Sequence, residues 1–240
     1  MLSLLRNDQS RPFIGGHRGA RSKAPDNTWD GFEAGLASGA DLIECDVQIL
    51  SSNQPVLFHG FYFNDIDGEK KWIWNLSQAE AKSILGDKFI LLEDLLDWAK
   101  NRIKLALDIK VGFDFGLPIA ESIVSSIHKT NSVNNVFLIS WTHDTLYKAK
   151  TIEPDVAIAP LLYCRPANPI AYAQSINANA LFMRRPQIDK KLIEDAHSQG
   201  IAISPIDIFN HTSENYKELA EMGIDIMIVD DPEFAVQCFS

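Results

Sequence analysis

The sequence predicts a single (β/α)8 barrel that spans residues 1–240. Eight short runs of β-forming residues alternate with amphipathic segments along the chain. Such alternation indicates parallel strands joined by helical crossovers. The length of 240 residues also lies close to the ~250 residues typical of a closed barrel. The first predicted strand leads into Gly-Gly-His-Arg-Gly, which does not fit the GxGxxG turn of a dinucleotide-binding open sheet.

The predicted elements follow one another in a regular order. Strands are expected at residues 13–16, 41–49, 104–110, 136–140, 156–161, 178–183, 201–206 and 224–229. Helices are expected at residues 28–38, 91–101, 118–129, 143–151, 169–176, 190–199, 213–221 and 232–239. Gly39, Gly200 and Gly223 follow three of these helices, and Pro118 and Pro232 begin two of them, as is typical of helix ends.

One stretch after the second predicted strand interrupts the alternation. Residues 51–55 have the composition of a turn, and residues 56–58 are expected to form a short extra strand that ends at His59. Residues 60–75 contain many aromatic and charged residues without a regular period. We therefore expect a long loop there, on the functional rim of the barrel.

The composition is that of a soluble globular protein, with 46% hydrophobic and 22% charged residues. The formal net charge of −10 disfavours binding to nucleic acids or anionic membrane surfaces, which reward Lys and Arg. The first residues lack the apolar run of a signal peptide, and no stretch approaches the ~20 apolar residues of a membrane span. We expect a cytoplasmic protein without stable membrane association that acts on a small molecule. The sequence leaves its oligomeric state open.

Acidic residues interrupt two of the apolar strands. Because side chains alternate along a strand, Glu44 and Asp46 share one face of the second strand, and Asp108 and Lys110 share one face of the third. In a closed barrel the functional face lies at the carboxyl ends of the strands. Three carboxylates gathered there would repel one another, and a divalent cation would relieve the repulsion. An oxygen-only ligand set favours one Mg²⁺ or Ca²⁺ ion over zinc.

Basic and titratable side chains lie at neighbouring strand ends. Arg18 and Lys110 would add positive charge beside the metal, and a cation together with Arg and Lys describes a phosphate site. His17 and His59 can accept and donate protons near neutral pH. Taken alone, residues such as Glu44 and Asp46 or Asp108 and Lys110 commonly belong to structural ion pairs. A histidine at a strand end is commonly structural or solvent-facing. Their convergence at the ends of the first strands favours a catalytic site.

Several short motifs follow one another along the chain with a characteristic order and spacing. The strongest are His-Arg-Gly-Ala at 17–20, Ala-Pro-Asp-Asn-Thr at 24–28, Gly-Ala-Asp at 39–41, Glu-Cys-Asp-Val at 44–47 and Pro-Val-Leu-Phe-His at 55–59. Weaker ones are Leu-Glu-Asp-Leu at 92–95, Asp-x-Lys at 108–110, Ser-Trp at 140–141 and Asp-Asp-Pro at 230–232. Together they resemble the glycerophosphodiester phosphodiesterase family over nearly the whole chain.

The resemblance implies a TIM barrel that uses a divalent cation, Mg²⁺ or Ca²⁺, to hydrolyse glycerophosphodiesters to glycerol 3-phosphate and an alcohol. It also implies an acid–base pair, a set of metal ligands and a set of substrate-binding residues. The implied acid–base pair is His17 and His59. The implied metal ligands are Glu44, Asp46 and Asp108, and the implied substrate-binding residues are Arg18, Lys110 and Trp141. The attacking group is either a hydroxyl of the substrate's glycerol, which gives a cyclic phosphate first, or water.

The second histidine motif departs from the family's pattern. Gly60 follows His59 at a position where Asp is usual, so the residue that would orient the imidazole is missing unless Asp65 or Asp67 replaces it. Asp108 stands where Glu is commoner. Both departures also resemble the spider-venom sphingomyelinase D group. A milder departure is Asp26, where the family usually has Glu.

The seventh strand departs as well, because Ser-Pro-Ile-Asp at 204–207 replaces Trp-Thr-Val-Asn. The loss of that tryptophan removes a wall of the pocket, which Trp72, Trp74 or Trp141 would have to supply. The Arg-Arg pair at 184–185 either reaches an anionic substrate or forms surface ion pairs.

Two other functions therefore stay open beside glycerophosphodiester hydrolysis. One is a phosphodiesterase of the same fold that acts on lysophospholipids, as a sphingomyelinase D-like enzyme would. The other is a catalytically impaired barrel that binds metal and phosphate without turnover.

Overall fold

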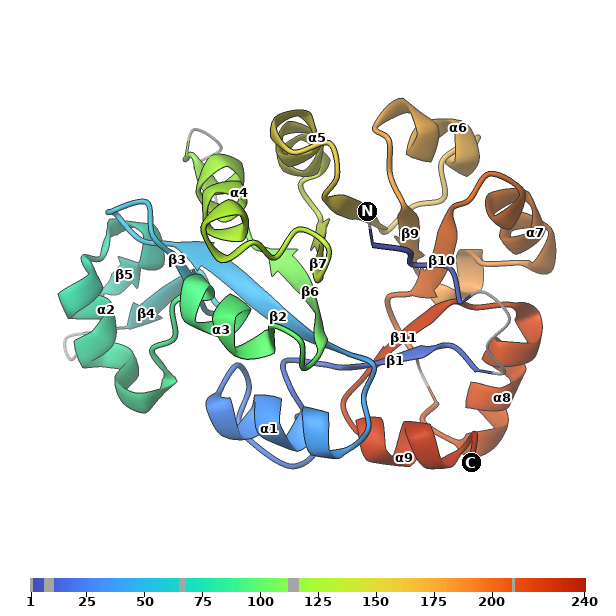
Figure 1. Cartoon of the computed structure of the whole chain (residues 1–240), viewed down its shortest axis with the longest axis horizontal. Coiled ribbons are helices and arrows are strands. Elements are labelled where there is room, and N and C mark those ends of the chain that lie inside the picture. The colour runs from blue at the N-terminus through green and yellow to red at the C-terminus, as the bar shows by residue number, and fades with distance from the viewer. Residues whose placement is uncertain (1, 7–10, 65–67, 112–116, 209) are drawn as a thin grey trace.

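The chain forms a nearly closed barrel of eight parallel strands (Figure 1), seen in a computed structural model that describes residues 2–6, 11–64, 68–111, 117–208 and 210–240. The barrel strands are β1 (Phe13–Gly16), β2 (Leu42–Ile49), β6 (Lys104–Ile109), β7 (Val136–Ser140), β8 (Ala157–Leu162), β9 (Ala180–Met183), β10 (Ala202–Pro205) and β11 (Ile226–Val229). Their order in the sheet is β10-β9-β8-β7-β6-β2-β1-β11. Asp225, just before β11, donates its backbone N–H to the carbonyl oxygen of Ile203 on β10 at 3.0 Å, which joins the two ends of the sheet.

Helices surround the barrel on its outside (Figure 1). They are α1 (Trp29–Ala37), α3 (Leu92–Ala99), α4 (Ile119–Thr130), α5 (His143–Ile152), α6 (Pro169–Ser175), α7 (Lys190–Ser198), α8 (Ser213–Met222) and α9 (Pro232–Gln237). The predicted α/β barrel is confirmed, and each predicted helix or strand ends within two residues of the observed one. Among the described helices, none combines the length and the apolar character needed to cross a membrane.

Strand β2 shows how the barrel directs polar side chains to its axis. All of its residues are buried. Cys45 packs in the core beneath the helices, whereas Leu42 packs with Phe137 in a separate core inside the barrel. Because alternate residues share a face, Glu44 and Asp46 point with Leu42 toward the barrel interior.

The segment between β2 and α3 forms a small subdomain beside the barrel, visible in Figure 1 around α2. It contains β3 (Pro55–Leu57), β4 (Tyr62–Asn64), β5 (Lys70–Trp72), α2 (Gln78–Leu85) and two 3-10 turns at Ile73–Asn75 and Gly86–Lys88. A third such turn, Arg185–Gln187, follows β9. Strand β3 pairs antiparallel with β2, and β4 pairs antiparallel with β5.

The prediction of a loop over residues 60–75 is therefore wrong for β4, β5 and the following turn, and helix α2 was not predicted. The strands have three residues each, which is too short for an alternating pattern to be recognised. Stacked aromatic rings stabilise the hairpin, with centroids 4.3 Å apart for Phe58 and Phe63. Helix α2 begins with a capping box between Ser77 and Glu80.

Candidate active site

Three carboxylates meet at the carboxyl ends of β2 and β6. Glu44 and Asp46 lie on β2, and Asp46 stands opposite Asp108 in the register between the two strands. One carboxylate oxygen from each residue lies within 4.8 Å of the others. The residues are 3%, 0% and 7% exposed, respectively. The structure thus gathers the three proposed metal ligands in one buried cluster.

Burial and mutual repulsion make this cluster costly without a counter-charge. Burial, together with the charges of Asp46 and Asp108, raises the pKa of Glu44 well above its ordinary value. Burial raises the pKa of Asp108 to about 6, although Lys110 opposes the shift. Burial alone would lower the pKa of Lys110, but the carboxylates around it, Asp108 first, raise it. A divalent cation would relieve the same repulsion.

Two oxygens of the cluster have capacity left for a ligand. Asp46 Oδ1 and Asp108 Oδ1 are buried, and neither accepts a hydrogen bond within the described part of the chain. Asp46 Oδ1 lies 3.0 Å from the Lys110 Nζ, so an ion pair covers it in part. Buried oxygens without a donor, in a set made only of carboxylates, fit a hard cation such as Mg²⁺ or Ca²⁺.

The two proposed phosphate-binding residues lie against the carboxylates. Arg18 Nε is 3.0 Å from Asp46 Oδ2, and Arg18 Nη1 donates to Asp26 Oδ2 at 2.7 Å. Lys110 Nζ pairs with Asp46 and with Asp108. Both side chains are 13% exposed, so they also reach the pocket described below.

A tight turn at the end of β1 positions His17 and Arg18. A Cβ atom at Gly16 would lie 1.9 Å from the carbonyl oxygen of Gly19, so only glycine fits this turn. Arg18 has a left-handed backbone with φ of 52°, and its N–H donates to Glu44 Oε2 at 2.9 Å. The turn is thereby fixed to the carboxylate cluster.

A carboxylate that sequence analysis did not assign holds the imidazole of His17. Asp230 Oδ1 lies 2.6 Å from His17 Nδ1, and His17 Nε2 lies 3.9 Å from Glu44 Oε2. Burial lowers the pKa of His17 below its ordinary value of 6.5, although the hydrogen bond to Asp230 opposes the shift. The neighbouring Asp231 instead caps α9 by accepting from the N–H of Phe234 at 3.0 Å. The Asp-Asp-Pro motif at 230–232 included Asp230, but it gave no indication that Asp230 contacts His17.

Asn27 is a second residue that sequence analysis left out of the site. Its Nδ2 donates to Asp46 Oδ2 at 2.8 Å, and its Oδ1 accepts from the Asp46 N–H at 3.2 Å. These two hydrogen bonds fix the orientation of the Asp46 carboxylate. The motif at 24–28 includes Asn27, which was the available indication.

His59 lies just beyond β3, on a turn that is tied to β2. The Phe58 N–H donates to the carbonyl oxygen of Asp46 at 3.1 Å, and Gln48 Nε2 donates to the carbonyl oxygen of Gly60 at 2.8 Å. Burial lowers the pKa of His59, although the charge of Asp46 opposes the shift.

Gly60 packs against the ring of Phe58, so a side chain at this position would require that ring to shift. A Cβ atom there would lie 2.9 Å from the ring of Phe58. Within the described residues, His59 has no carboxylate hydrogen-bonded to its ring. Asp65 and Asp67, the suggested replacements, lie outside the described residues.

These side chains line one pocket of about 260 Å³ at the carboxyl ends of the barrel strands. Its polar wall consists of His17, Arg18, Glu44, His59, Asp108 and Lys110. Its apolar wall consists of Ile139, Trp141, Leu161, Phe182, Pro205, Ile206 and Ile228. Of the eight predicted site residues, only the fully buried Asp46 is not part of the lining.

Comparison with known protein families identifies the family of this chain. The sequence profile of the glycerophosphoryl diester phosphodiesterase family matches residues 17–234. The chain belongs to this family. The predicted family and the prediction that the chain is an enzyme, a glycerophosphodiester phosphodiesterase, are therefore confirmed.

Alignments with similar proteins span nearly the whole length of this phosphodiesterase. A glycerophosphodiester phosphodiesterase from Caldanaerobacter subterraneus is 25% identical over 228 residues, covering 90% of this chain and 93% of the relative. A Parabacteroides distasonis glycerophosphodiester phosphodiesterase has a TM-score of 0.81 at 20% identity, covering 95% of this chain and 97% of that one. An Oleispira antarctica phosphodiesterase, solved in complex with the product sn-glycerol-3-phosphate, has a TM-score of 0.79 at 19% identity, covering 95% and 96%. These structures share the fold.

Of the three tryptophans proposed as an apolar wall of the phosphodiesterase, Trp141 lines the pocket. Its ring stacks on Tyr163, with centroids 4.1 Å apart. Trp72 and Trp74 are not part of the pocket lining and stack on each other in the subdomain, with centroids 5.0 Å apart.

The seventh barrel strand closes the pocket with apolar residues. Ser204 is buried outside the lining, whereas residues 205–206 belong to it. Asp207 holds both neighbouring arginines, because its Oδ2 accepts from Arg184 Nε and its Oδ1 from the Arg185 N–H, each at 2.9 Å. Neither arginine lines the pocket. Arg184 thus forms an ion pair with Asp207, and the guanidinium of Arg185 forms one with Glu218 at 3.3 Å.

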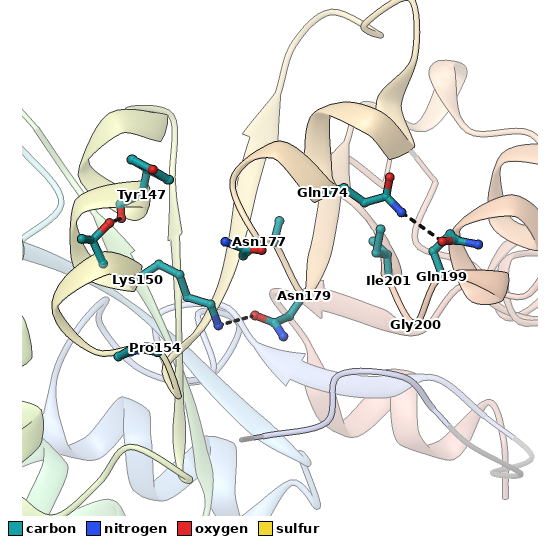
Figure 2. A pocket seen from close by; sticks show the side chains of 11 residues that line it. Tyr147, Lys150, Pro154, Gln174, Asn177, Asn179, Gln199, Gly200 and Ile201 are labelled. Carbon is teal, nitrogen blue, oxygen red and sulfur yellow. Dashed lines mark hydrogen bonds between the residues drawn. The ribbon is translucent and has the colours of Figure 1, made fainter.

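A larger cavity of about 610 Å³ lies at the opposite end of the barrel (Figure 2). Lys150 Nζ donates there to the carbonyl oxygen of Val156 at 2.8 Å and lies 3.4 Å from Asn179 Oδ1. Gln174 and Gln199 are hydrogen-bonded to each other nearby. None of the predicted site residues lines this cavity. The amino-terminal end of such barrels contributes to stability rather than to catalysis.

Proposed function

We propose that this enzyme hydrolyses glycerophosphodiesters to glycerol 3-phosphate and an alcohol in the pocket at the carboxyl ends of its strands. The observation that carries the proposal is the convergence of three carboxylates, two imidazoles and two cationic side chains around one pocket. Glu44, Asp46 and Asp108 would hold Mg²⁺ or Ca²⁺. When bound, the ion neutralises negative charge on the phosphoryl oxygens.

Arg18 and Lys110 are proposed to bind the phosphate oxygens. Both side chains line the pocket and are held in place by carboxylates. Charge-assisted hydrogen bonds from such pre-organised cations stabilise the charge that develops in the transition state. Trp141 is proposed to contact the organic part of the substrate from the apolar wall.

His17 is proposed to act as the general base. An ionised carboxylate can only accept hydrogen bonds, so the contact with Asp230 places the proton on His17 Nδ1. This leaves Nε2 with a free lone pair, and the lowered pKa keeps it unprotonated at neutral pH. Nε2 would take the proton of the attacking glycerol hydroxyl or water. His59, the second imidazole of the pocket, would donate a proton to the leaving alkoxide from its protonated form, which burial disfavours and the charge of Asp46 favours.

Chelation of divalent cations with EDTA is expected to lower the release of glycerol 3-phosphate from glycerophosphocholine by about 10³-fold, because metal-ion catalysis contributes several kcal/mol. Adding back Mg²⁺ and Ca²⁺ separately identifies the ion that restores activity. The ion that binds should also raise the melting temperature, since it binds only the folded protein. Full activity after chelation would contradict the metal site. A raised melting temperature without turnover would favour the impaired phosphate-binding barrel.

Asp230→Asn is expected to lower kcat by roughly 10- to 100-fold, a part of the 10²–10⁴-fold that general acid–base catalysis contributes. Asp230 raises the pKa of His17, so its loss should also move the acidic limb of the pH profile of kcat/KM to lower pH. Asp231→Asn is the matched control, because Asp231 contacts α9 and Asn is an equally good helix cap. An equal loss of activity in both variants would refute the positioning role of Asp230.

A further inference from the structure

A second cavity, of about 430 Å³, adjoins the catalytic pocket, and His59 lines both. Ligand pockets usually enclose ~300–1,000 Å³. The catalytic pocket, at about 260 Å³, is below this range, whereas the second cavity lies within it. The size suggests that the second cavity holds a further part of the substrate.

The end of the cavity nearest the site is polar. Asp26 and Asn27 line it, and both also contact the catalytic residues, Asp26 through Arg18 and Asn27 through Asp46. A group attached to a phosphate beside Arg18 would therefore enter the cavity past Asp26, Asn27 and His59.

The rest of the cavity is mostly apolar. Its wall comes from β3, β4 and α2 and consists of Leu57, Phe58, Phe63, Ile84 and Leu85. Phe58 stacks on Phe63 within this wall, and the Phe58 N–H donates to the carbonyl oxygen of Asp46 in the catalytic cluster. The wall is thus fixed in position relative to the carboxylates.

Ile84 shows that part of this apolar surface is open. It is 47% exposed, among the large apolar side chains that the described structure leaves accessible. Leaving an isoleucine accessible forgoes the stability that its burial would contribute. An apolar group in the cavity would cover it. Lys88 is the charged residue among the lining residues of α2 and the turn that follows it.

We propose that this cavity is a subsite for one hydrocarbon chain of the substrate, and that the enzyme therefore accepts glycerophosphodiesters that carry a single acyl chain, the lysophospholipid class. The inference rests on the proposed function, because the chain reaches the cavity as part of a phosphodiester held in the catalytic pocket. A chain rather than a polar head group is indicated by the five apolar side chains of the wall.

Binding is tested first, by calorimetry with butyl-, hexyl- and octylphosphocholine in the presence of Ca²⁺, below their micellar concentrations. The affinity is expected to rise by up to about fourfold for each added methylene, which is the exponential of ~0.8 kcal/mol divided by RT at 25 °C. Ile84→Glu should remove most of this dependence on chain length. Ile152→Glu, at an equally exposed isoleucine on α5 (43%), is the matched control and should keep it.

Turnover is tested next, with glycerophosphocholine and its 1-octanoyl derivative. The wild type is expected to prefer the octanoyl substrate in kcat/KM, and Ile84→Glu should reduce that preference about tenfold or more, whereas Ile152→Glu should not. If the enzyme hydrolyses glycerophosphocholine but its affinity for the alkylphosphocholines does not depend on chain length, the proposed subsite is overturned and the proposed hydrolysis stands. Absence of turnover with both substrates would overturn the proposed hydrolysis, and chain-length-dependent binding would then still support the cavity as an alkyl site.

Discussion

His17→Ala is expected to lower kcat for glycerophosphocholine hydrolysis by about 10³-fold, because general acid–base catalysis by a positioned side chain contributes 10²–10⁴-fold. The side chain lines the catalytic pocket, is held by Asp230, and is the residue proposed to remove the proton of the attacking group. KM should change much less than kcat, since the phosphate-binding residues Arg18 and Lys110 remain. Steady-state kinetics with the metal-loaded enzyme measures both quantities.

His59→Ala should have an effect of similar size, and the double variant should be less impaired than the product of the two single effects, because the histidines act in one proton transfer sequence. His128→Ala serves as the control. His128 is a surface histidine that pairs with Glu153 at 2.6 Å and lies outside the pocket lining. Wild-type kcat in the double variant would rule out acid–base catalysis by these residues.

Asp108→Asn is expected to abolish the stabilisation by Mg²⁺ or Ca²⁺ and to lower kcat by about 10³-fold, as expected when a metal term of several kcal/mol is lost. The substitution keeps the size of the side chain while removing one of the three charges around the proposed ion. Asp108 Oδ1 is a buried oxygen without a hydrogen-bond donor among the described residues, which makes it a direct candidate for coordination. The measurement is the shift in melting temperature with added ion, alongside kcat.

The same variant should change how stability depends on pH. The pKa of Asp108 is raised from 3.8 to about 6 in the folded protein, chiefly by burial. Between these pH values the folded state binds more protons than the unfolded state, so the free energy of unfolding of the ion-free protein falls as pH rises. Asp108→Asn should flatten this fall, and the surface variant Asp195→Asn should not. A retained rise in melting temperature with added ion would contradict the proposed ligand role of Asp108. An unchanged pH dependence of stability would contradict its raised pKa.

The regular part of the fold could be predicted from the sequence because each β/α unit repeats the same local pattern. The failures lie where that pattern is absent. Strands β4 and β5 have three residues each, and their aromatic side chains stack on one another rather than on the barrel core. In helix α2 only Ala81 is buried, so its amphipathic pattern is weak. The expectation of an irregular loop followed from the same weakness.

The candidate site could be predicted where the relevant residues belong to one strand or one short motif. Glu44 and Asp46 share a face by strand alternation, and Asp108 pairs with Asp46 in register. The carboxylate partner of His17 was not accessible in this way. Asp230 is 213 residues from His17 and reaches it because β1 pairs with β11. The cytoplasmic location and the extent of the domain stay predictions.

The sequence by itself determined the eight-fold alternation, the strand ends at which charged side chains would meet and the family's motifs, because these depend on local periodicity and spacing. The tertiary structure alone decided which groups touch. Closure of the barrel placed Asp230 on His17, and packing of the subdomain against β2 created an apolar cavity beside His59. Contacts of this kind depend on distances between segments far apart in the chain, which no local pattern encodes.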